Sequence, residues 1–176
     1  HPFGASKWAR NFIKPPIGSW LVYIDYSSQE PAIMGYLSGD KNKIRAYQSG
    51  DIYIDTAKQF DKVPETATPE THPKERATFK VIDLANNFGQ GHVSVAQSLK
   101  CSTSHAKFLM KKYKETFKVY FEWLDGVIEH GMCRGYMSTV YGWQRHIKDL
   151  FQIKNGKRVD IRRSLMNWPI QSHGAE

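Results

Sequence analysis

Apolar residues recur every three or four positions through the middle of the chain, which is the spacing of α-helices that bury one face. The longest such pattern predicts a single amphipathic helix over residues 103–129. Its apolar stripe is expected in the core and comprises Phe108, Tyr113, Phe117, Tyr120, Phe121 and Leu124. Residues 76–91 predict another helix, preceded by a polar loop over residues 61–72 that is rich in proline and threonine.

Shorter elements are expected before that loop. Residues 20–25 (WLVYID) are rich in aromatic and β-branched side chains, which predicts a buried strand that ends at an acid. The helix that follows is expected to have Ser28 as its N-cap and to end at Gly39. Asp40 and Asp51 can each cap a further short helix.

The last third of the chain predicts strands and one helix. Residues 135–147 and 150–161 have the alternation of strands, and Asn155-Gly156 within the second stretch is a strong hairpin signal. Residues 160–176 predict a final helix that Pro169 bends or ends. Helices between a first strand and later hairpins place the chain in the α+β class.

The net charge of the chain indicates what kind of partner it binds. Lysine and arginine number 25 against 17 acidic residues, for a formal net charge of +8, which favours nucleic acid or another polyanion as the partner. The alternative is a basic, solvated surface. Cys101 and Cys133 show no ligand spacing, so we expect a reduced, cytoplasmic protein without a disulfide. No apolar run approaches the roughly 18 residues of a membrane span, and therefore no membrane partner is expected.

Candidate chemistry begins with residues 76–91 (RATFKVIDLANNFGQG). Arg76, Lys80, Leu84 and Phe88 are each four positions apart, so they share one face of the predicted helix. That face suits a ligand with an anionic end and a flat apolar end, because the guanidinium and ammonium precede the alkyl group and the ring. The alternative is an ordinary amphipathic helix with a basic edge.

Two acids form the second candidate. Asp25 ends the predicted buried strand, where a carboxylate is costly unless it is paired or bound to a cation. Glu30 lies in the first turn of the next helix, where an acid suits the helix dipole or forms a wall beside a ligand. A capping or ion-paired aspartate remains the simpler alternative for Asp25.

Four stretches resemble the family A DNA polymerases in order and approximate spacing. They are IDYSSQEPAIMGYLSGD, RATFKVIDLANNFGQG, TVYGWQR and RRSLMNWPIQSHGAE, and the details are most similar to the phage and bacterial branch. The resemblance implies a polymerase palm, with a partial antiparallel sheet, and a helical fingers subdomain. Residues 1–38 would be palm with motif A, residues 39–130 fingers with motif B, and residues 131–176 a return to the palm with template-contacting hairpins and a helix.

The resemblance also implies roles for individual residues. Asp25 and the Tyr26 backbone carbonyl would bind Mg²⁺, and Lys80 would act in catalysis by adding charge or a proton to the leaving pyrophosphate. Glu30 would exclude a 2′-hydroxyl. The dNTP would contact Tyr26, Glu30, Tyr53, Arg76, Lys80, Leu84 and Phe88, and primer-template DNA would contact Arg145, Arg163, Asn167 and Gln171. Leu84 stands where the family usually has Phe or Tyr, and Tyr53 where many relatives have His.

The implied activity is template-directed transfer of dNTPs to a primer 3′-hydroxyl by a two-magnesium mechanism, in phage or bacterial DNA replication. No His-Asp dipeptide occurs, so the motif C carboxylate that would be the second metal ligand is missing. The chain also begins at His1 and stops at Glu176 inside a predicted helix. We therefore expect a fragment that is inactive alone and needs the rest of the polymerase chain as its partner.

Two other functions fit parts of the pattern. A single-subunit RNA polymerase uses similar motifs A and B, but Glu30 and the GQG after Phe88 argue against it. A non-catalytic, basic DNA-binding module would explain the charge but not Asp25, Glu30 and Lys80 in register. P-loop and zinc enzymes are disfavoured because neither a GxxxxGK[ST] motif nor clustered Cys and His residues occur.

Overall fold

The computed structural model describes residues 12–22, 24–154 and 156–176. Its helices are α2 (Gln29–Ser38), α3 (Lys41–Gln48), α4 (Ile52–Gln59), α5 (Pro73–Asn87), α6 (His92–Leu99), α7 (Thr103–Thr116), α8 (Lys118–Arg134), α9 (Arg162–Leu165) and α10 (Trp168–Ala175). Its strands are β1 (Tyr136–Ser138), β2 (Gln144–His146), β3 (Phe151–Lys154) and β4 (Lys157–Asp160). Helices with two small antiparallel sheets confirm the α+β class.

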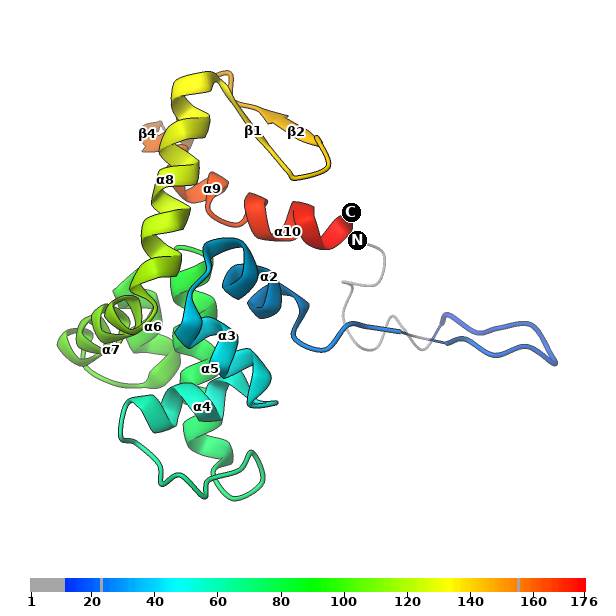
Figure 1. Cartoon of the computed structure of the whole chain (residues 1–176), viewed down its shortest axis with the longest axis vertical. Helices are drawn as coiled ribbons and strands as arrows, with labels where there is room; N and C mark the ends of the chain where they lie inside the picture. The colour runs from blue at the N-terminus through cyan, green and yellow to red at the C-terminus, as the bar shows by residue number, and fades with distance from the viewer. Residues whose placement is uncertain (1–11, 23, 155) are drawn as a thin grey trace.

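The long helix α8 joins two parts of the described chain (Figure 1). Helices α2 to α7 gather around its first half, and the β1–β2 hairpin extends from its far end. Helix α10 lies between α2 and that hairpin, where the Gln29 side chain donates a hydrogen bond of 2.8 Å to the Gly174 carbonyl. Helix α10 is thereby held against α2, the helix that follows Asp25.

The predicted apolar stripe of residues 103–129 is confirmed as core for most of its members. Tyr113, Phe117, Tyr120 and Leu124 are almost fully buried, and they pack with residues of α2, α4, α5, α9 and α10 in one cluster. Phe108 is the exception and is 57% exposed, so its assignment to the core was wrong. Phe108 and Tyr113 both lie on α7, and the five residues between their positions turn about 140° around the helix axis, which directs Phe108 away from the core.

The prediction of one helix over residues 103–129 was wrong, because it divides into α7 and α8 at Phe117. Two side chains of the α3 region satisfy the backbone at the break. Asn42 donates a hydrogen bond of 2.8 Å to the Thr116 carbonyl, and Asp40 accepts one of 3.0 Å from the Tyr120 amide. Helix ends need such partners, and these lie more than seventy residues away in the sequence, beyond the reach of a local pattern.

The predicted caps before α5 are confirmed. The Asp40 carboxylate accepts hydrogen bonds from two amides of α3, and Asp51 does the same for α4. Gly39 ends α2 with φ of 69°, a left-handed conformation that glycine adopts at little cost. Ser28 is the N-cap residue of α2 as expected, but its side chain makes no capping hydrogen bond.

The buried strand predicted over residues 20–25 is not present in the described residues of that segment. Trp20, Leu21, Val22 and Ile24 are largely exposed, and the segment runs away from the helices (Figure 1). Tyr23 lies outside the described residues. A strand needs a neighbour for its amide and carbonyl groups, and none of the described strands pairs with this segment.

The two C-terminal hairpins are confirmed, with β1 paired to β2 and β3 paired to β4. Asn155 of the predicted turn lies outside the described residues, and Gly156 beside it has φ of 70°. The predicted final helix is instead two helices, α9 and α10, and Pro169 lies in the first turn of the second one. Proline suits that place because its missing amide would have no helical partner there.

Candidate functional site

Helix α5 carries the predicted ligand-binding face. Pro73 begins the helix, where its fixed φ is favourable, and Phe88 follows its last residue. Along one stripe, Lys80 is exposed, and Arg76, Leu84 and Phe88 are each about one-third exposed. The four-residue spacing therefore places these side chains on an accessible face, with cations toward the start of the helix and apolar groups toward its end.

Helix α4 packs beside the cationic end and orders it. The Asp51 carboxylate, which caps α4, also accepts a hydrogen bond of 2.6 Å from Arg76 Nε. The Tyr53 ring centroid lies 5.2 Å from Arg76 Cζ and 6.0 Å from Lys80 Nζ. Three of the predicted dNTP-contacting residues are thus brought together, with the Arg76 side chain fixed by an ion pair and a cation–π contact.

Glu30 joins this region from α2. It is half-buried, and this burial raises the pKa of its carboxyl group, while a hydrogen bond with Gln171 of α10 opposes the rise and the negative charge of Asp83 adds to it. Burial likewise raises the pKa of Tyr53, and Glu30 is among the charges that act on that group. Glu30 therefore links Gln171 of α10, its hydrogen-bond partner, to Tyr53 of α4, on which its charge acts.

The buried face of α5 adjoins this stripe beside Arg76 and holds an ion pair. Lys43 Nζ of α3 lies 3.5 Å from Asp83 Oδ1, and both side chains are less than one-tenth exposed. The Tyr113 hydroxyl donates to Asp83 and accepts a hydrogen bond of 2.7 Å from Lys43. The ammonium also lies between 4.6 and 5.1 Å from the ring centroids of Tyr113, Phe117 and Tyr120.

Burial sets the protonation behaviour of this network. It lowers the pKa of Lys43, although the Asp83 carboxylate acts in the opposite direction. It raises the pKa of Tyr113 well above its ordinary value, and Asp83 reinforces that rise. A carboxylate and a hydroxyl that share one ammonium offset part of the cost of burying these charges. Helix α5 is therefore attached to α3 and α7 by specific contacts as well as by packing.

The residues predicted to contact DNA meet the end of α5 only in part. Gly89 follows α5 with φ of 65°, and a Cβ placed there would lie 3.0 Å from Arg163 Cγ. Glycine thus lets the Arg163 stem approach the helix end. Arg145 on β2 donates a hydrogen bond of 3.0 Å to the Ser164 carbonyl. The Asn167 Oδ1 atom is buried, and the described residues provide no hydrogen-bond partner for it.

Asp25 and Tyr26 do not join this cluster. Both are exposed on the segment that precedes α2. The expected donors, a carboxylate and a backbone carbonyl, are the hard oxygen ligands that Mg²⁺ prefers, so their chemistry fits one part of a magnesium site. Among the described residues, no group of three or more His, Cys, Asp or Glu side chains is close enough together to hold a metal ion.

Sequence reasoning missed the groups behind the exposed face. Asp83 lies four residues after the buried Phe79 and seven after the accessible Arg76, so the helical period already places this acid at the edge of the apolar face, beside the stripe. That signal could have identified it. Lys43 carries no such signal, because only the fold brings it to Asp83. Among the described residues, no helix combines the length and apolar character needed to cross a membrane.

A family comparison covers nearly the whole chain. Residues 4–176 match the family described as DNA polymerase family A. The chain is 31% identical over 160 residues to the thermostable DNA polymerase I of Thermus aquaticus, which covers 90% of this chain and 19% of the relative. It is 32% identical over 158 residues to DNA polymerase I of Mycobacterium leprae, covering 89% and 17%. The chain thus spans about a fifth of the length of these curated relatives.

A solved structure agrees with this match. The POL domain of Pol1 from M. smegmatis, in complex with DNA primer-template and dNTP, superposes with a TM-score of 0.71 at 32% identity. The superposition covers 86% of this chain and 26% of that one.

Proposed function

The chain belongs to DNA polymerase family A, and from that premise we propose that it forms the nucleotide-binding fingers and part of the palm of a DNA-directed DNA polymerase. The observation that carries the proposal is the exposed stripe of α5, where Arg76 and Lys80 surround Tyr53 and the apolar Leu84 and Phe88 follow. A dNTP has the complementary shape, with anionic phosphates at one end and a sugar and base at the other.

Each side chain of the stripe has a part in this proposal. Arg76, held by Asp51, presents its remaining N–H groups to the triphosphate, and Lys80 adds a mobile positive charge at the leaving pyrophosphate. Leu84 and Phe88 pack against the sugar and the bases. Phosphoryl transfer depends mainly on charge neutralisation and in-line positioning, and fixed cations supply both without rearranging during the reaction.

Glu30 controls the sugar in this proposal. Its hydrogen bond with Gln171 and its partial burial hold the carboxyl group at the junction of α2 and α10. A group fixed in that way excludes a ribose 2′-hydroxyl by occupying its space. Gln171, together with Arg145, Arg163 and Asn167, would then contact the primer-template near the new base pair.

Mg²⁺ would be held by Asp25 and the Tyr26 carbonyl, and when bound it would activate the primer 3′-hydroxyl and neutralise the phosphates. The position of Asp25 shortly before α2 supports this role, because only four residues lie between it and Glu30. A second carboxylate would be supplied by the remainder of a polymerase such as the relatives, since this sequence holds no His-Asp element. We therefore propose that these 176 residues do not extend a primer alone.

In this proposal, different segments of the chain form different subdomains of the polymerase. Residues 1–38 would contribute to the palm, residues 39–130 would form the fingers, and residues 131–176 would return to the palm. Helix α8 runs through the second boundary, so it would couple fingers and palm mechanically. The bacterial origin of the relatives supports a role in bacterial or phage DNA replication.

The test is templated primer extension by the full-length protein that carries these residues, with and without Mg²⁺. We expect extension that follows the template, requires Mg²⁺ and is nearly abolished by Asp25→Asn. Asp61→Asn removes another exposed carboxylate and is the matched control, which should extend normally. Extension by Asp25→Asn at the rate of the control would refute the metal-binding role, and no templated synthesis by the wild-type protein would refute the function.

A further inference from the structure

The turn of the β1–β2 hairpin is bonded to the end of α10 by side chains that have no part in the proposed function. This turn comprises residues 139–143, and the hairpin lies beside α10 (Figure 1). His173 Nε2 accepts a hydrogen bond of 3.1 Å from the Val140 amide, and the Glu176 carboxylate accepts one from the Thr139 hydroxyl. These two hydrogen bonds are called the turn contact below.

The hydrogen bonds of His173 require a neutral ring. Its Nδ1 atom is bonded to the Pro169 carbonyl oxygen, which can only accept, so Nδ1 carries the proton and donates. The Val140 amide can only donate, so Nε2 carries no proton. A second proton on the ring would place two donors against each other and break the bond to the turn. His173 therefore holds the turn only in its uncharged state.

Thr139 extends the turn contact into the hairpin. The residue is buried, and its hydroxyl donates to Glu176 while it accepts a hydrogen bond of 2.9 Å from the Trp143 amide. The Trp143 ring also packs edge-on against Trp168 of α10, with 6.3 Å between the ring centroids. The shape of the turn and its place on α10 are therefore fixed by the same side chains.

The turn contact joins two elements that carry proposed DNA contacts. The turn leads directly into β2, which carries Arg145, and α10 carries Gln171. His173 lies two positions after Gln171, which is about 200° around the helix axis, so the two side chains leave α10 on different sides. His173 would thus act on DNA through the relative position of Arg145 and Gln171.

We infer that His173 is a positioning residue, which fixes Arg145 relative to Gln171 on the primer-template while its ring is neutral and releases the hairpin turn when the ring is protonated. The inference rests on the proposed function, because it takes these two residues to contact DNA. A turn that is already fixed needs no ordering when DNA binds, whereas a released turn does, and binding is weaker by that amount.

Other groups near α10 also carry charge between about pH 5.5 and 8. On α2, α9 and the hairpin, which pack against α10, and at its own end, they are Glu30, Arg145, His146, Arg162, Arg163 and Glu176. All six remain in the variants described next. Their own titration therefore cancels when a variant is compared with wild type at each pH.

The experiment measures the dissociation constant of a primer-template with a two-nucleotide overhang for the full-length protein, by fluorescence anisotropy at about pH 8 and about pH 5.5. His173→Phe keeps a ring but has no acceptor, and it should weaken binding about two- to tenfold at the higher pH, as for one lost hydrogen bond. His173→Gln has an amide donor and acceptor that do not titrate, so it should bind as wild type does at the higher pH. At the lower pH it should bind about two- to tenfold more tightly than wild type.

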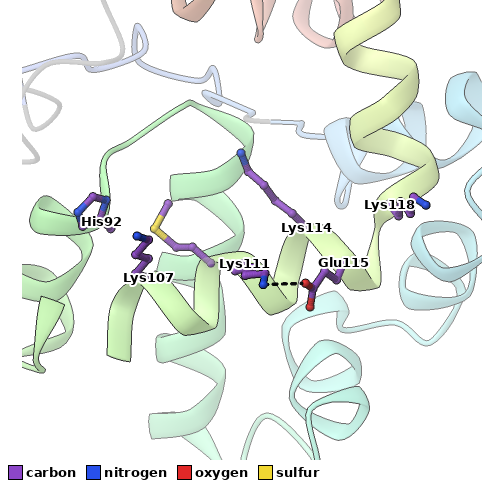
Figure 2. Close-up of a pocket in the computed structure, with 7 residues that line it drawn as sticks. His92, Lys107, Lys111, Lys114, Glu115 and Lys118 are labelled. Atoms are coloured by element: carbon purple, nitrogen blue, oxygen red, sulfur yellow. Dashed lines mark ion pairs between the residues drawn. The ribbon is translucent and has the colours of Figure 1, made fainter. Parts of the chain in front are cut away.

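His92→Gln is the matched control, because it also removes one histidine. His92 is exposed at the start of α6, where it lines a cleft with Lys107 and Lys111 of α7 (Figure 2). The control should keep the wild-type ratio of the two dissociation constants, whereas His173→Gln should not. Equal ratios for wild type and His173→Gln, or equal affinities of wild type and His173→Phe at the higher pH, would overturn the inference.

Hydrogen exchange separates positioning from a general loss of stability. Mass spectrometry of the full-length protein without DNA should show faster exchange of residues 139–143 in His173→Phe, and wild-type exchange in His173→Gln and His92→Gln. Unchanged exchange of this turn in His173→Phe would also overturn the inference. Templated extension by the wild-type protein tests the proposed function separately, so extension combined with failure of these comparisons refutes the role of His173 alone.

Discussion

The two faces of α5 use charge in opposite ways. On one face Arg76 and Lys80 are accessible, and the Arg76 ion pair with Asp51 leaves most of the guanidinium free to bind a ligand. On the adjoining buried face Lys43 and Asp83 form an ion pair, and the Tyr113 hydroxyl is hydrogen-bonded to both. Fifteen residues of one helix thus carry a surface for an anion and a polar anchor inside the core.

The difference shows what each kind of charge can do. Burying an ion pair costs desolvation free energy, so the pair adds little net stability. Removing one partner leaves an unpaired buried charge, which is strongly destabilising. The pair therefore fixes how α5 packs on α3 and α7. An exposed cation contributes little to stability but keeps its interaction for the ligand. Substitutions on the buried face should therefore alter folding, and those on the exposed face should alter catalysis.

The largest effect is expected on the buried face. Lys43→Met leaves Asp83 buried without its cation, and Asp83→Asn leaves Lys43 without its anion. Each should lower the free energy of unfolding by about 3–5 kcal/mol, measured by urea denaturation of the 176-residue chain. The double variant should be much less destabilised than the sum of the two, because neither charge is then left unpaired. Single-variant losses below about 1 kcal/mol, together with additivity, would show that water reaches this pair.

On the exposed face, Lys80→Ala should reduce the rate of nucleotide incorporation by about 10²–10³-fold in the full-length protein. The free energy of unfolding should change by less than about 0.5 kcal/mol, because the side chain is exposed. Lys74→Ala, also exposed on α5, is the control and should retain the wild-type rate. A normal rate for Lys80→Ala in single-turnover kinetics would remove Lys80 from the site.

Leu84 lies at the apolar end of the stripe, and its substitution should have an effect of intermediate size on nucleotide selectivity. Leu84→Phe restores a flat ring, which should pack against the incoming sugar and base and sharpen selection of the nucleotide. We expect the ratio of incorporation efficiencies for correct and dideoxy or mismatched nucleotides to change by about ten- to two-hundredfold. Equal ratios for the two proteins would indicate that position 84 contacts only protein.

The smallest effect concerns Glu30, whose pKa is raised above its ordinary value of 4.5 mainly by partial burial. The folded state then holds the proton more tightly than the unfolded state, which is stabilising at low pH and is lost as pH rises through the raised pKa. The Glu30→Gln variant has no carboxyl group at this position, so it does not lose this stability as pH rises. Relative to wild type, it should gain stability as pH increases from about 4 to 7, and a constant difference over that range would contradict the burial of Glu30.

Local sequence patterns predicted the features whose partners are nearby in the chain. The spacing of Arg76, Lys80, Leu84 and Phe88 predicted a shared face, and helix caps such as Asp51 were confirmed because a cap contacts only the next few residues. The ion pair of Asp51 with Arg76 was not predicted, although each residue was singled out.

The features that depend on distant residues were predicted poorly. The break at Phe117 needs Asp40 and Asn42, and the environment of Lys43 needs three helices. The strand predicted over residues 20–25 has the right side chains but no paired neighbour among the described strands. A periodic pattern records which face is apolar, and it contains no information about which segment covers that face.

The most direct test of the exposed face is the apparent dissociation constant of a dNTP for Arg76→Ala. It is measured from the dNTP dependence of single-turnover incorporation by the full-length protein with Mg²⁺. Arg45→Ala, which removes an exposed arginine of α3, is the matched control. The account predicts a dissociation constant about tenfold or more above wild type for Arg76→Ala and an unchanged one for the control. An unchanged value for Arg76→Ala would contradict the assignment of this face of α5 to the triphosphate.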